Sequence, residues 1–348
     1  PEQLEELDVD LIYGTGDRMQ FLDDLEQAVH GKQRVNVDAV MRRREFEFLP
    51  AGGLEGRTRC MLKVEDGCVN FCTYCAIPYA RGPVRSLPLD EAVAEARRMA
   101  GEGYQEIVVT GIEISSWGKD LKNGQSLIDL LEALCAAVPA LRTRLGSLEP
   151  RTITEDFCAR AAKLANLCPH FHLSLQSGCD ATLKRMNRKY DTARYLESCA
   201  LLRQYFDDPA ITTDLITGFP GETEEEFEQT LAFIQKAAFS AMHVFPYSRR
   251  TGTPACDMPG QVPMQEKEAR AHRAAAVAGE MEQAYLGRQL GRTVPVLFEE
   301  EKDGLWRGHT PNYIEVRAES VDNLHNQLRQ VELTEIDGAH LIGKLVEA

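Results

Sequence analysis

The sequence places three cysteines within one short stretch: Cys68, Cys72 and Cys75, with the spacing C-x3-C-x2-C. Cysteine thiolates are the usual ligands of iron–sulfur clusters, which normally take four of them. Three thiolates at this spacing can each bind one iron of a four-iron cluster, and they leave the fourth iron without a protein ligand. The stretch therefore predicts a cluster with one open coordination position.

Zinc binding and disulfide formation are the alternatives for such a stretch. A structural zinc ion takes four nitrogen or sulfur ligands, and Cys60 or His170 could supply the fourth. A disulfide framework is disfavoured, because ten cysteines in 348 residues is well below the density of disulfide scaffolds. We recognise no secretory signal segment. We therefore expect the other seven cysteines to be structural and the compartment to be the reducing cytoplasm.

The composition is that of a globular protein, with 43% apolar and 27% charged residues. No apolar run approaches the length that a membrane span requires, so we expect no membrane partner, and we expect a monomer. The formal net charge is −15. Nucleic-acid-binding proteins usually carry a basic surface, so any such contact in this chain must come from a local basic patch.

Between residues 58 and 247 the pattern alternates between strands and helices. The predicted strands span 60–64, 107–110, 142–147, 171–175, 211–217 and 241–245. The predicted helices span 90–101, 126–138, 154–167, 180–187, 191–206 and 223–238. This alternation predicts a parallel α/β sheet. Six units are fewer than the eight of a full barrel, which leaves an open partial barrel or a doubly wound sheet.

The two flanks differ from this central region. Residues 1–50 contain one predicted strand, 9–13, and one predicted helix, 19–29, which are too few to bury a core alone. A helix over 266–285 leads to residues 286–348, where apolar and polar residues alternate as in a small antiparallel β-barrel. We therefore expect three parts: 1–50, 51–285 and 286–348.

Several loops that follow the predicted strands carry residues suited to binding a ligand. These residues are Gly111 and Glu113 after the second strand, Gln176, Ser177 and Gly178 after the fourth, Gly218 and Gly221 after the fifth, and Tyr247 after the sixth. Glycines expose the backbone to a ligand, and a helix N-terminus favours anions. Each loop alone is a weak indication, but the loops after parallel strands gather on one functional face.

The motifs together resemble the radical S-adenosylmethionine (SAM) methylthiotransferases. They are GCVNFCTYCAIPYARGPVRS, TGIE, LQSG, LKRMNRKY, DLITGFPGETEEEF and FPYSRRTGTPA. The resemblance implies an open partial (βα)6 TIM-like barrel, followed by a small antiparallel β-barrel similar to a TRAM domain. ARGPVRS, TGIEISSWG and FPYSRRTGTPA are similar to the MtaB type, which acts on N6-threonylcarbamoyladenosine beside the anticodon of tRNA. The branches that act on isopentenyl-adenosine of tRNA or on a ribosomal protein aspartate look different at these loops.

The resemblance also implies cofactors and a reaction. A [4Fe-4S] cluster on Cys68, Cys72 and Cys75 would bind SAM at its open iron, and a flavodoxin or ferredoxin would supply the electron. SAM cleavage would give a 5′-deoxyadenosyl radical, which abstracts the hydrogen at C2 of the target adenine before the methylthio group is added. Gly111 and Glu113 would lie at the methionine end of SAM, Gln176, Ser177 and Gly178 near its ribose, and Gly218, Gly221 and Tyr247 near its adenine.

Binding of tRNA requires basic residues near the same face. The candidates are Arg81, Arg85, Lys184, Arg185, Arg188, Lys189, Arg249 and Arg250, with Trp306, His309 and Tyr313 as possible stacking surfaces. A solvated helix face is the alternative for residues 184–189, and core packing is the alternative for the aromatic residues.

The family carries three further cysteines in an N-terminal domain, where they hold a second cluster. No cysteine precedes Cys60 here, so residues 1–50 resemble only the last part of that domain. We therefore expect one cluster in this chain, a second in a full-length protein, and SAM cleavage without methylthiolation by this chain alone. A zinc-stabilised RNA-binding module is the rival outside the enzymes.

Overall fold

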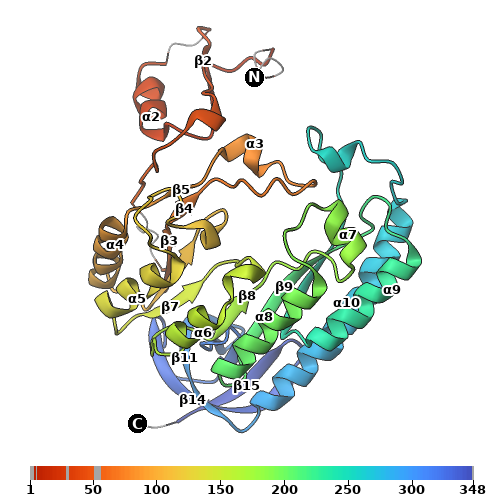
Figure 1. The fold of residues 1–348 in the computed structure, drawn as a ribbon. Helices are drawn as coiled ribbons and strands as arrows, with labels where there is room; N and C mark the ends of the chain where they lie inside the picture. The colour runs from red at the N-terminus through yellow and green to blue at the C-terminus, as the bar shows by residue number, and fades with distance from the viewer. Residues whose placement is uncertain (1–3, 5, 29–30, 51–55, 347–348) are drawn as a thin grey trace.

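The computed structural model describes residues 4, 6–28, 31–50 and 56–346, and six parallel strands lie at its centre (Figure 1). They form two three-stranded sheets with the orders β3-β6-β7 and β8-β9-β10. The strands are β3 (Arg59–Lys63), β6 (Glu106–Thr110), β7 (Arg142–Leu145), β8 (His170–His172), β9 (Ala210–Thr217) and β10 (Ala241–Pro246). The third and fourth strands are shorter than the sequence pattern predicted.

The two sheets continue into each other through a parallel bridge between Leu148 and Leu173. The Leu148 N–H donates to the carbonyl of His172 at 2.8 Å, and the Ser174 N–H donates to the carbonyl of Leu148 at 3.1 Å. In the described part of the chain, β10 does not pair with β3. The six strands are therefore an open partial barrel, which confirms the predicted fold class.

Helices cover the outer side of these strands in Figure 1. They are α4 (Leu89–Gly101), α5 (Leu127–Ala137), α6 (Glu155–Ala161), α7 (Asp180–Arg185), α8 (Thr192–Tyr205) and α9 (Glu224–Ala237). Capping boxes begin α5 at Ser126 and α9 at Thr223, and Thr154 accepts from the backbone of α6. Each cap satisfies N–H groups that the first turn leaves without a helical partner. Helix α6 ends at Ala161, six residues earlier than predicted.

The C-terminal region is a second, closed barrel with the strand order β11-β12-β13-β15-β14. Its strands are β11 (Thr293–Lys302), β12 (Leu305–His309), β13 (Glu315–Ala318), β14 (Gln327–Asp337) and β15 (His340–Leu345). Phe298, Val316 and Leu341 form part of its own core. The expected antiparallel barrel is confirmed except at β13 and β15, which pair in parallel. The 26-residue helix α10 (Met264–Gln289) precedes it.

A buried ion network joins the two barrels. Glu106, the first residue of β6, is fully buried and pairs with Arg142 and Arg144 at 2.7 Å each. These arginines donate onward to backbone carbonyls between β12 and β13: Arg142 to His309 at 3.1 Å, and Arg144 to Pro311 at 2.9 Å. One carboxylate therefore balances the two cations that hold the second barrel.

The N-terminal segment contains β1 (Leu11–Tyr13), which pairs in parallel with β2 (Arg34–Asn36). Helix α2 (Arg18–Glu26) buries none of its residues, and a 3-10 helix, η1 (Val40–Arg42), follows β2. Strand β2 was not predicted, and the predicted end of the helix at Val29 lies outside the described residues. At the far side of this segment, η1 contacts α3 (Ile77–Arg81).

We predict that Glu106→Gln destabilises the chain strongly. Without the carboxylate, Arg142 and Arg144 become buried charges with no counter-ion. Breaking a buried ion pair lowers the free energy of unfolding by about 3–5 kcal/mol. Urea unfolding would measure the change. Glu228→Gln is the control, since Glu228 pairs with Arg273 at the surface, where an ion pair contributes about 0–1 kcal/mol. Equal shifts in the two variants would contradict the assignment.

Candidate functional site

The three cysteines lie in a closed loop at the carboxyl end of β3. The loop connects β4 (Glu65–Asp66) to β5 (Arg85–Ser86), and these two short strands pair antiparallel. At its base the Cys68 N–H donates to the carbonyl of Gly82 at 3.0 Å. Gly67 has a φ of +91°, and a Cβ there would lie 2.0 Å from the carbonyl oxygen of Pro83. Glycine is therefore required for the loop to close.

Two other segments hold the cysteine loop from either side. On the side of α7, the Thr73 N–H donates to the carbonyl of Met186 at 3.1 Å, and the Asn187 side chain donates to the carbonyl of Phe71 at 2.8 Å. On the other side, the 3-10 helix η4 (Pro254–Cys256) donates from the Ala255 N–H to the carbonyl of Thr73 at 2.9 Å. The loop is thus fixed by the chain that follows β8 and by the chain that follows β10.

The thiols of this loop are suited to metal binding rather than to nucleophilic attack. Cys72 is buried, and Cys68 and Cys75 are partly buried. Burial raises the pKa of the Cys68 thiol to about 11 and raises the pKa of Cys75 above its ordinary value. A nucleophilic cysteine needs a lowered pKa, whereas a coordinated metal ion deprotonates a thiol outright.

The zinc alternative does not find its fourth ligand at this loop. Cys60 lies on β3, where its sulfur faces the carbonyl of Glu106 at 3.8 Å. His170 is the first residue of β8, so it lies at the opposite end of the partial barrel. Among the described residues, no three His, Cys, Asp or Glu side chains converge as the ligands of a single ion. A cubane cluster instead distributes its ligands over separate iron corners.

Two buried carboxyl groups lie beside the loop. The backbone N–H of Glu113 donates to the Glu65 carboxyl at 2.7 Å. Gly111 permits this approach, because a Cβ there would lie 2.8 Å from the carbonyl oxygen of Glu65. Burial raises the pKa of Glu65 to about 8 and raises the pKa of Glu113. The Ser116 hydroxyl donates to Oε2 of Glu113. Oε1 of Glu113 is buried and has no hydrogen-bond partner among the described residues.

A cavity of about 380 Å³ opens beside the cysteine loop at the carboxyl ends of the strands, and we call it the upper cavity. Its lining residues are Tyr74, Cys75, Gln176, Asp214, Ile216, Phe245, Pro246, Tyr247, Ser248 and Arg250. Four of them, Cys75, Gln176, Tyr247 and Arg250, were predicted from sequence. Asp214 was missed, although an acidic residue inside the otherwise uncharged strand β9 indicates a side chain that faces the barrel interior.

The residues after β8 divide between the upper cavity and the packing of α9. Gln176 lines the cavity with a φ of +70°, a strained conformation for a residue with a Cβ. Ser177 is fully buried, and its hydroxyl lies 3.4 Å from that of Thr230 on α9. A Cβ at Gly178 would lie 2.9 Å from the Cα of Thr230. Ser177 and Gly178 therefore position Gln176 in this structure rather than line the cavity.

The residues after β9 and β10 form an aromatic wall. Tyr247 packs edge-on against Phe219 at 5.3 Å between ring centroids, and its hydroxyl is buried without a partner. Gly218 has a φ of +67°, and a Cβ there would lie 2.3 Å from the side chain of Lys267. Gly221 has a φ of +76°, in the left-handed region that favours glycine. Both glycines thus have structural reasons to be glycine.

The predicted basic residues do not all reach solvent. Lys184, Lys189, Arg249 and Arg250 are exposed. Arg81 lies 3.6 Å from Asp66. Arg85 is buried and pairs with the same carboxylate at 3.3 Å, so its guanidinium is not available to a phosphate.

Two further arginines from the predicted set have partners inside the protein. Arg185 pairs with Glu226 of α9. Arg188 donates to the sulfur of Cys72 at 3.1 Å. Both side chains are therefore engaged by the protein itself, and sequence reasoning did not anticipate either contact.

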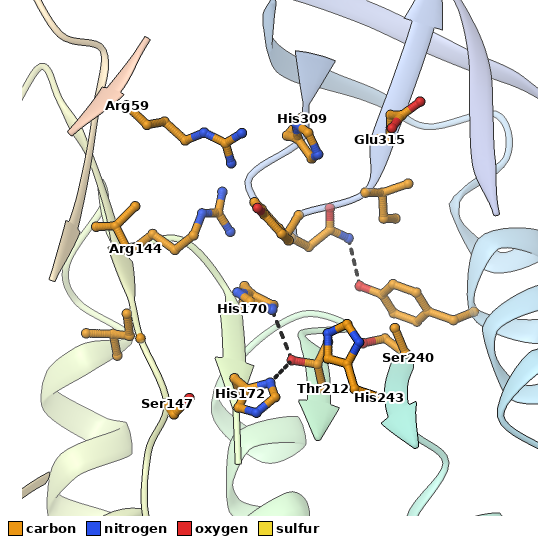
Figure 2. A pocket seen from close by; sticks show the side chains of 18 of the residues that line it. Arg59, Arg144, Ser147, His170, His172, Thr212, Ser240, His243, His309 and Glu315 are labelled. Carbon is orange, nitrogen blue, oxygen red and sulfur yellow. Dashed lines mark hydrogen bonds between the residues drawn. The ribbon is translucent and has the colours of Figure 1, made fainter. Parts of the chain in front are cut away.

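A second cavity, of about 610 Å³, lies at the amino ends of the strands where the two barrels meet, and we call it the lower cavity. Figure 2 shows Arg59 and Arg144 pointing into it from β3 and β7, opposite His309. Tyr313 stacks against both His170 and His309, at 5.2 Å and 4.8 Å. Trp306 is buried in the second barrel, which agrees with the core-packing alternative. Tyr313 and His309 pack at the joint between the barrels, but Tyr313 keeps 44% of its surface exposed, so stacking of these two on RNA bases stays a prediction.

A line of hydrogen-bonding side chains runs between the two cavities. The Thr212 hydroxyl lies 3.1 Å from Nε2 of His170 and 3.0 Å from Nδ1 of His172, as the dashed lines in Figure 2 show. Nε2 of His172 lies 3.4 Å from the Asp214 carboxylate, which lines the upper cavity. The barrel interior is therefore polar along its length.

Comparison with known proteins agrees with this geometry. Residues 62–234 match the model of the Radical SAM superfamily. The chain is 36% identical over 332 residues to the threonylcarbamoyladenosine tRNA methylthiotransferase MtaB of Bacillus subtilis (strain 168), covering 93% of this chain and 73% of that protein. It is 37% identical to the MtaB protein of Thermotoga maritima over 335 residues, covering 96% and 76%. The chain belongs to the radical SAM methylthiotransferase family.

Other relatives and structures are also similar to it. A tRNA-2-methylthio-N(6)-dimethylallyladenosine synthase of Acetivibrio thermocellus is 33% identical over 341 residues, covering 97% of this chain and 71% of that protein. The radical SAM methyltransferase TsrM of Kitasatospora setae aligns with a TM-score of 0.48 and 18% identity, covering 56% and 38% of the two chains. Coproporphyrinogen III oxidase of Escherichia coli aligns with a TM-score of 0.47 and 15% identity, covering 70% and 55%.

The cysteine loop and the residues around the upper cavity fit the cofactors of a radical SAM methylthiotransferase. Three cysteines on one fixed loop suit an iron–sulfur cluster. Several buried polar atoms near them have no hydrogen-bond partner among the described residues, and they include Oε1 of Glu113 and the hydroxyl of Tyr247. Unsatisfied buried polar atoms are uncommon in folded proteins and call for a partner. SAM offers an ammonium donor and a polar adenosine that can meet this requirement.

We predict a pH-dependent effect of Glu65→Gln on stability. The folded chain keeps the Glu65 proton up to about pH 8, whereas the unfolded chain loses it near pH 4.3, the ordinary value. The native contribution of Glu65 therefore falls as pH rises through this window, by at most about 1.4 kcal/mol per unit. The glutamine side chain does not titrate in this range. The free energy of unfolding of Glu65→Gln, relative to that of the native chain, should therefore rise between pH 5 and pH 8.

Urea unfolding at several pH values measures this difference. Glu301→Gln, at an exposed position, is the control for the loss of one carboxylate. A difference between Glu65→Gln and the native chain that stays flat from pH 5 to pH 8 would show that the Glu65 carboxyl is ionised in the folded protein.

Proposed function

We propose that this chain is a tRNA methylthiotransferase that adds a methylthio group to C2 of N6-threonylcarbamoyladenosine next to the anticodon. The observation that carries the proposal is the fixed three-cysteine loop at the edge of the upper cavity, with Cys75 in the cavity wall. The relatives named for this nucleoside are 33–37% identical, and one named for the dimethylallyl nucleoside is 33% identical. The dimethylallyl nucleoside is therefore the alternative substrate.

In this proposal the chain's own residues hold and orient the cofactors. Cys68, Cys72 and Cys75 bind a [4Fe-4S] cluster, and Oε1 of Glu113 accepts from the SAM ammonium group. Gln176 and Tyr247 bind the adenosine part within the upper cavity. When bound, the cluster and SAM together supply the carbon radical that removes a hydrogen atom from the target. Such a radical requires that water and other C–H groups be kept out of the site during the reaction.

The cluster count and the partners are further parts of the proposal. The 348 residues carry one three-cysteine loop, which supports one cluster per chain. We propose that a flavodoxin or ferredoxin reduces it, that the chain acts as a monomer in the cytoplasm, and that residues 1–50, 51–285 and 286–348 are its three parts. No helix in the described part of the chain has the length and apolarity needed to cross a membrane.

The cluster prediction is tested by metal content. After anaerobic reconstitution we expect about four irons and four sulfides per chain, and cleavage of added SAM to 5′-deoxyadenosine. The triple variant of Cys68, Cys72 and Cys75 to alanine should lose both. Cys256→Ala is the control, because Cys256 lies outside the three-cysteine loop. A colourless native protein with one zinc ion would support the RNA-binding module instead.

The substrate is tested with tRNA from cells that lack 2-methylthio nucleosides. With a longer protein of the family that carries a second cluster, mass spectrometry of the nucleosides should show a methylthio group on threonylcarbamoyladenosine. With these 348 residues alone we expect SAM cleavage without methylthiolation. Modification of the dimethylallyl nucleoside would assign the chain to the other branch. SAM cleavage without any modified tRNA is the outcome expected if methylthiolation needs a second cluster.

We predict that Arg250→Ala weakens tRNA binding at every sequence. Arg250 is exposed and lines the upper cavity, where a phosphate contact contributes through counter-ion release. The slope of log affinity against log salt should decrease by about 1. Arg273→Ala is the control, since Arg273 pairs with Glu224 and Glu228 on α9. Binding measured at several salt concentrations decides this, and equal affinities of Arg250→Ala and the native chain would exclude the contact.

A further inference from the structure

The segment from Arg185 to Tyr190, directly after α7, holds the cysteine loop through a series of contacts. The Thr73 hydroxyl donates to the carbonyl of Arg185 at 2.9 Å, and Asn187 bonds the carbonyl of Phe71. These contacts are between backbone groups and neutral side chains. The contact made by Arg188 differs, because it brings a permanent cation to a cluster ligand.

The Arg188 guanidinium donates four hydrogen bonds, one of them to the sulfur of Cys72. One Nη donates to the Cys72 sulfur at 3.1 Å and to the Tyr74 hydroxyl at 3.4 Å. The other Nη donates to the carbonyl of Ser174 at 3.4 Å, and Nε donates to the Tyr190 hydroxyl at 2.9 Å. The guanidinium also lies 4.9 Å from the centre of the Tyr190 ring. Its position is therefore determined on several sides.

The charge of Arg188 has no carboxylate partner within the described residues. Other partly or fully buried arginines nearby do have one: Arg85 pairs with Asp66 and Arg185 with Glu226. A partly buried cation is costly to keep without a counter-ion. The group with anionic character that Arg188 reaches is the Cys72 thiolate, which carries its charge when a metal cluster is bound.

We propose that Arg188 sets the reduction potential of the cluster by donating a charge-assisted hydrogen bond to the Cys72 sulfur. Hydrogen bonds to the sulfurs and the net charge around a cluster are among the determinants of its potential. Reduction adds one electron from the external donor, and no bond forms or breaks in the protein. The added negative charge strengthens the attraction to Arg188, so the cation favours the reduced cluster. This inference rests on the proposed cluster at this loop.

The test is the midpoint potential of the reconstituted chain, followed by electron paramagnetic resonance during a redox titration without SAM. Arg188→Gln keeps an N–H donor but removes the charge. In this variant we expect the equilibrium constant for reduction of the cluster to fall at least tenfold. For a one-electron couple this is about 59 mV towards more negative potential. Arg188→Lys keeps the charge and should shift the potential less than Arg188→Gln.

Arg185→Gln is the matched control, since it removes an arginine three residues away whose side chain pairs with Glu226. Its potential should equal that of the native chain. An unchanged potential in Arg188→Gln overturns the proposal, and loss of SAM affinity with that unchanged potential would make Arg188 a SAM ligand instead. A native chain that takes up no iron would instead contradict the proposed function itself.

A second variant decides the question if Arg188→Gln fails to retain a cluster. Tyr190→Phe removes the hydroxyl that accepts from Nε of Arg188 and leaves the charge in place. A more negative potential in Tyr190→Phe supports the proposal, because the cation is then less firmly held against Cys72. A native potential in this variant overturns it.

Discussion

The cysteine loop is held in place by the chain that follows α7 and by η4. The three-cysteine site and the upper cavity both depend on this constraint. The three thiols are buried or partly buried, and burial raises the pKa of Cys68 and of Cys75. Such thiols suit a metal cluster, and a cluster needs ligands that do not move. The loop obtains its rigidity from contacts with Met186, Asn187 and Ala255. Those contacts bring the ends of β8 and β10 to the cysteines, and the upper cavity forms between them. Its position at the carboxyl ends of parallel strands agrees with the general location of active sites in barrels.

The opposite end of the partial barrel makes the joint with the second barrel. There Glu106 balances Arg142 and Arg144, and the arginines bind the turn that precedes β13. Tyr313 completes the joint by stacking between two histidines. In Figure 1 the second barrel lies at this lower end, with α3 and the N-terminal segment at the other. Between the two cavities, Thr212 and Asp214 provide partners for Nε2 of His170 and for both ring nitrogens of His172 inside the barrel.

The sequence predicted features whose cause is local. The cysteine spacing and the six strands depend on residues close to one another. The strand pattern alone left a doubly wound sheet open, and the family resemblance indicated the open (βα)6 barrel. The sequence did not predict features made by distant segments. Arg85 and Arg188 look like exposed basic residues until Asp66 and Cys72 are placed beside them. The lower cavity combines residues from both barrels, and Ser177 is directed to α9 by packing that no short motif records.

The contacts of the cysteine loop also determine when the site can assemble during synthesis. Arg185, Asn187 and Arg188 follow their partners in the loop by 112 to 116 residues along the chain, and Ala255 comes later still. The cysteines therefore leave the ribosome long before the groups that hold them, and contacts of such high sequence separation form late because loop closure must precede them. Cluster insertion before residue 256 is made would meet an unfixed loop. The order of the chain thus places metal loading after the partial barrel has folded.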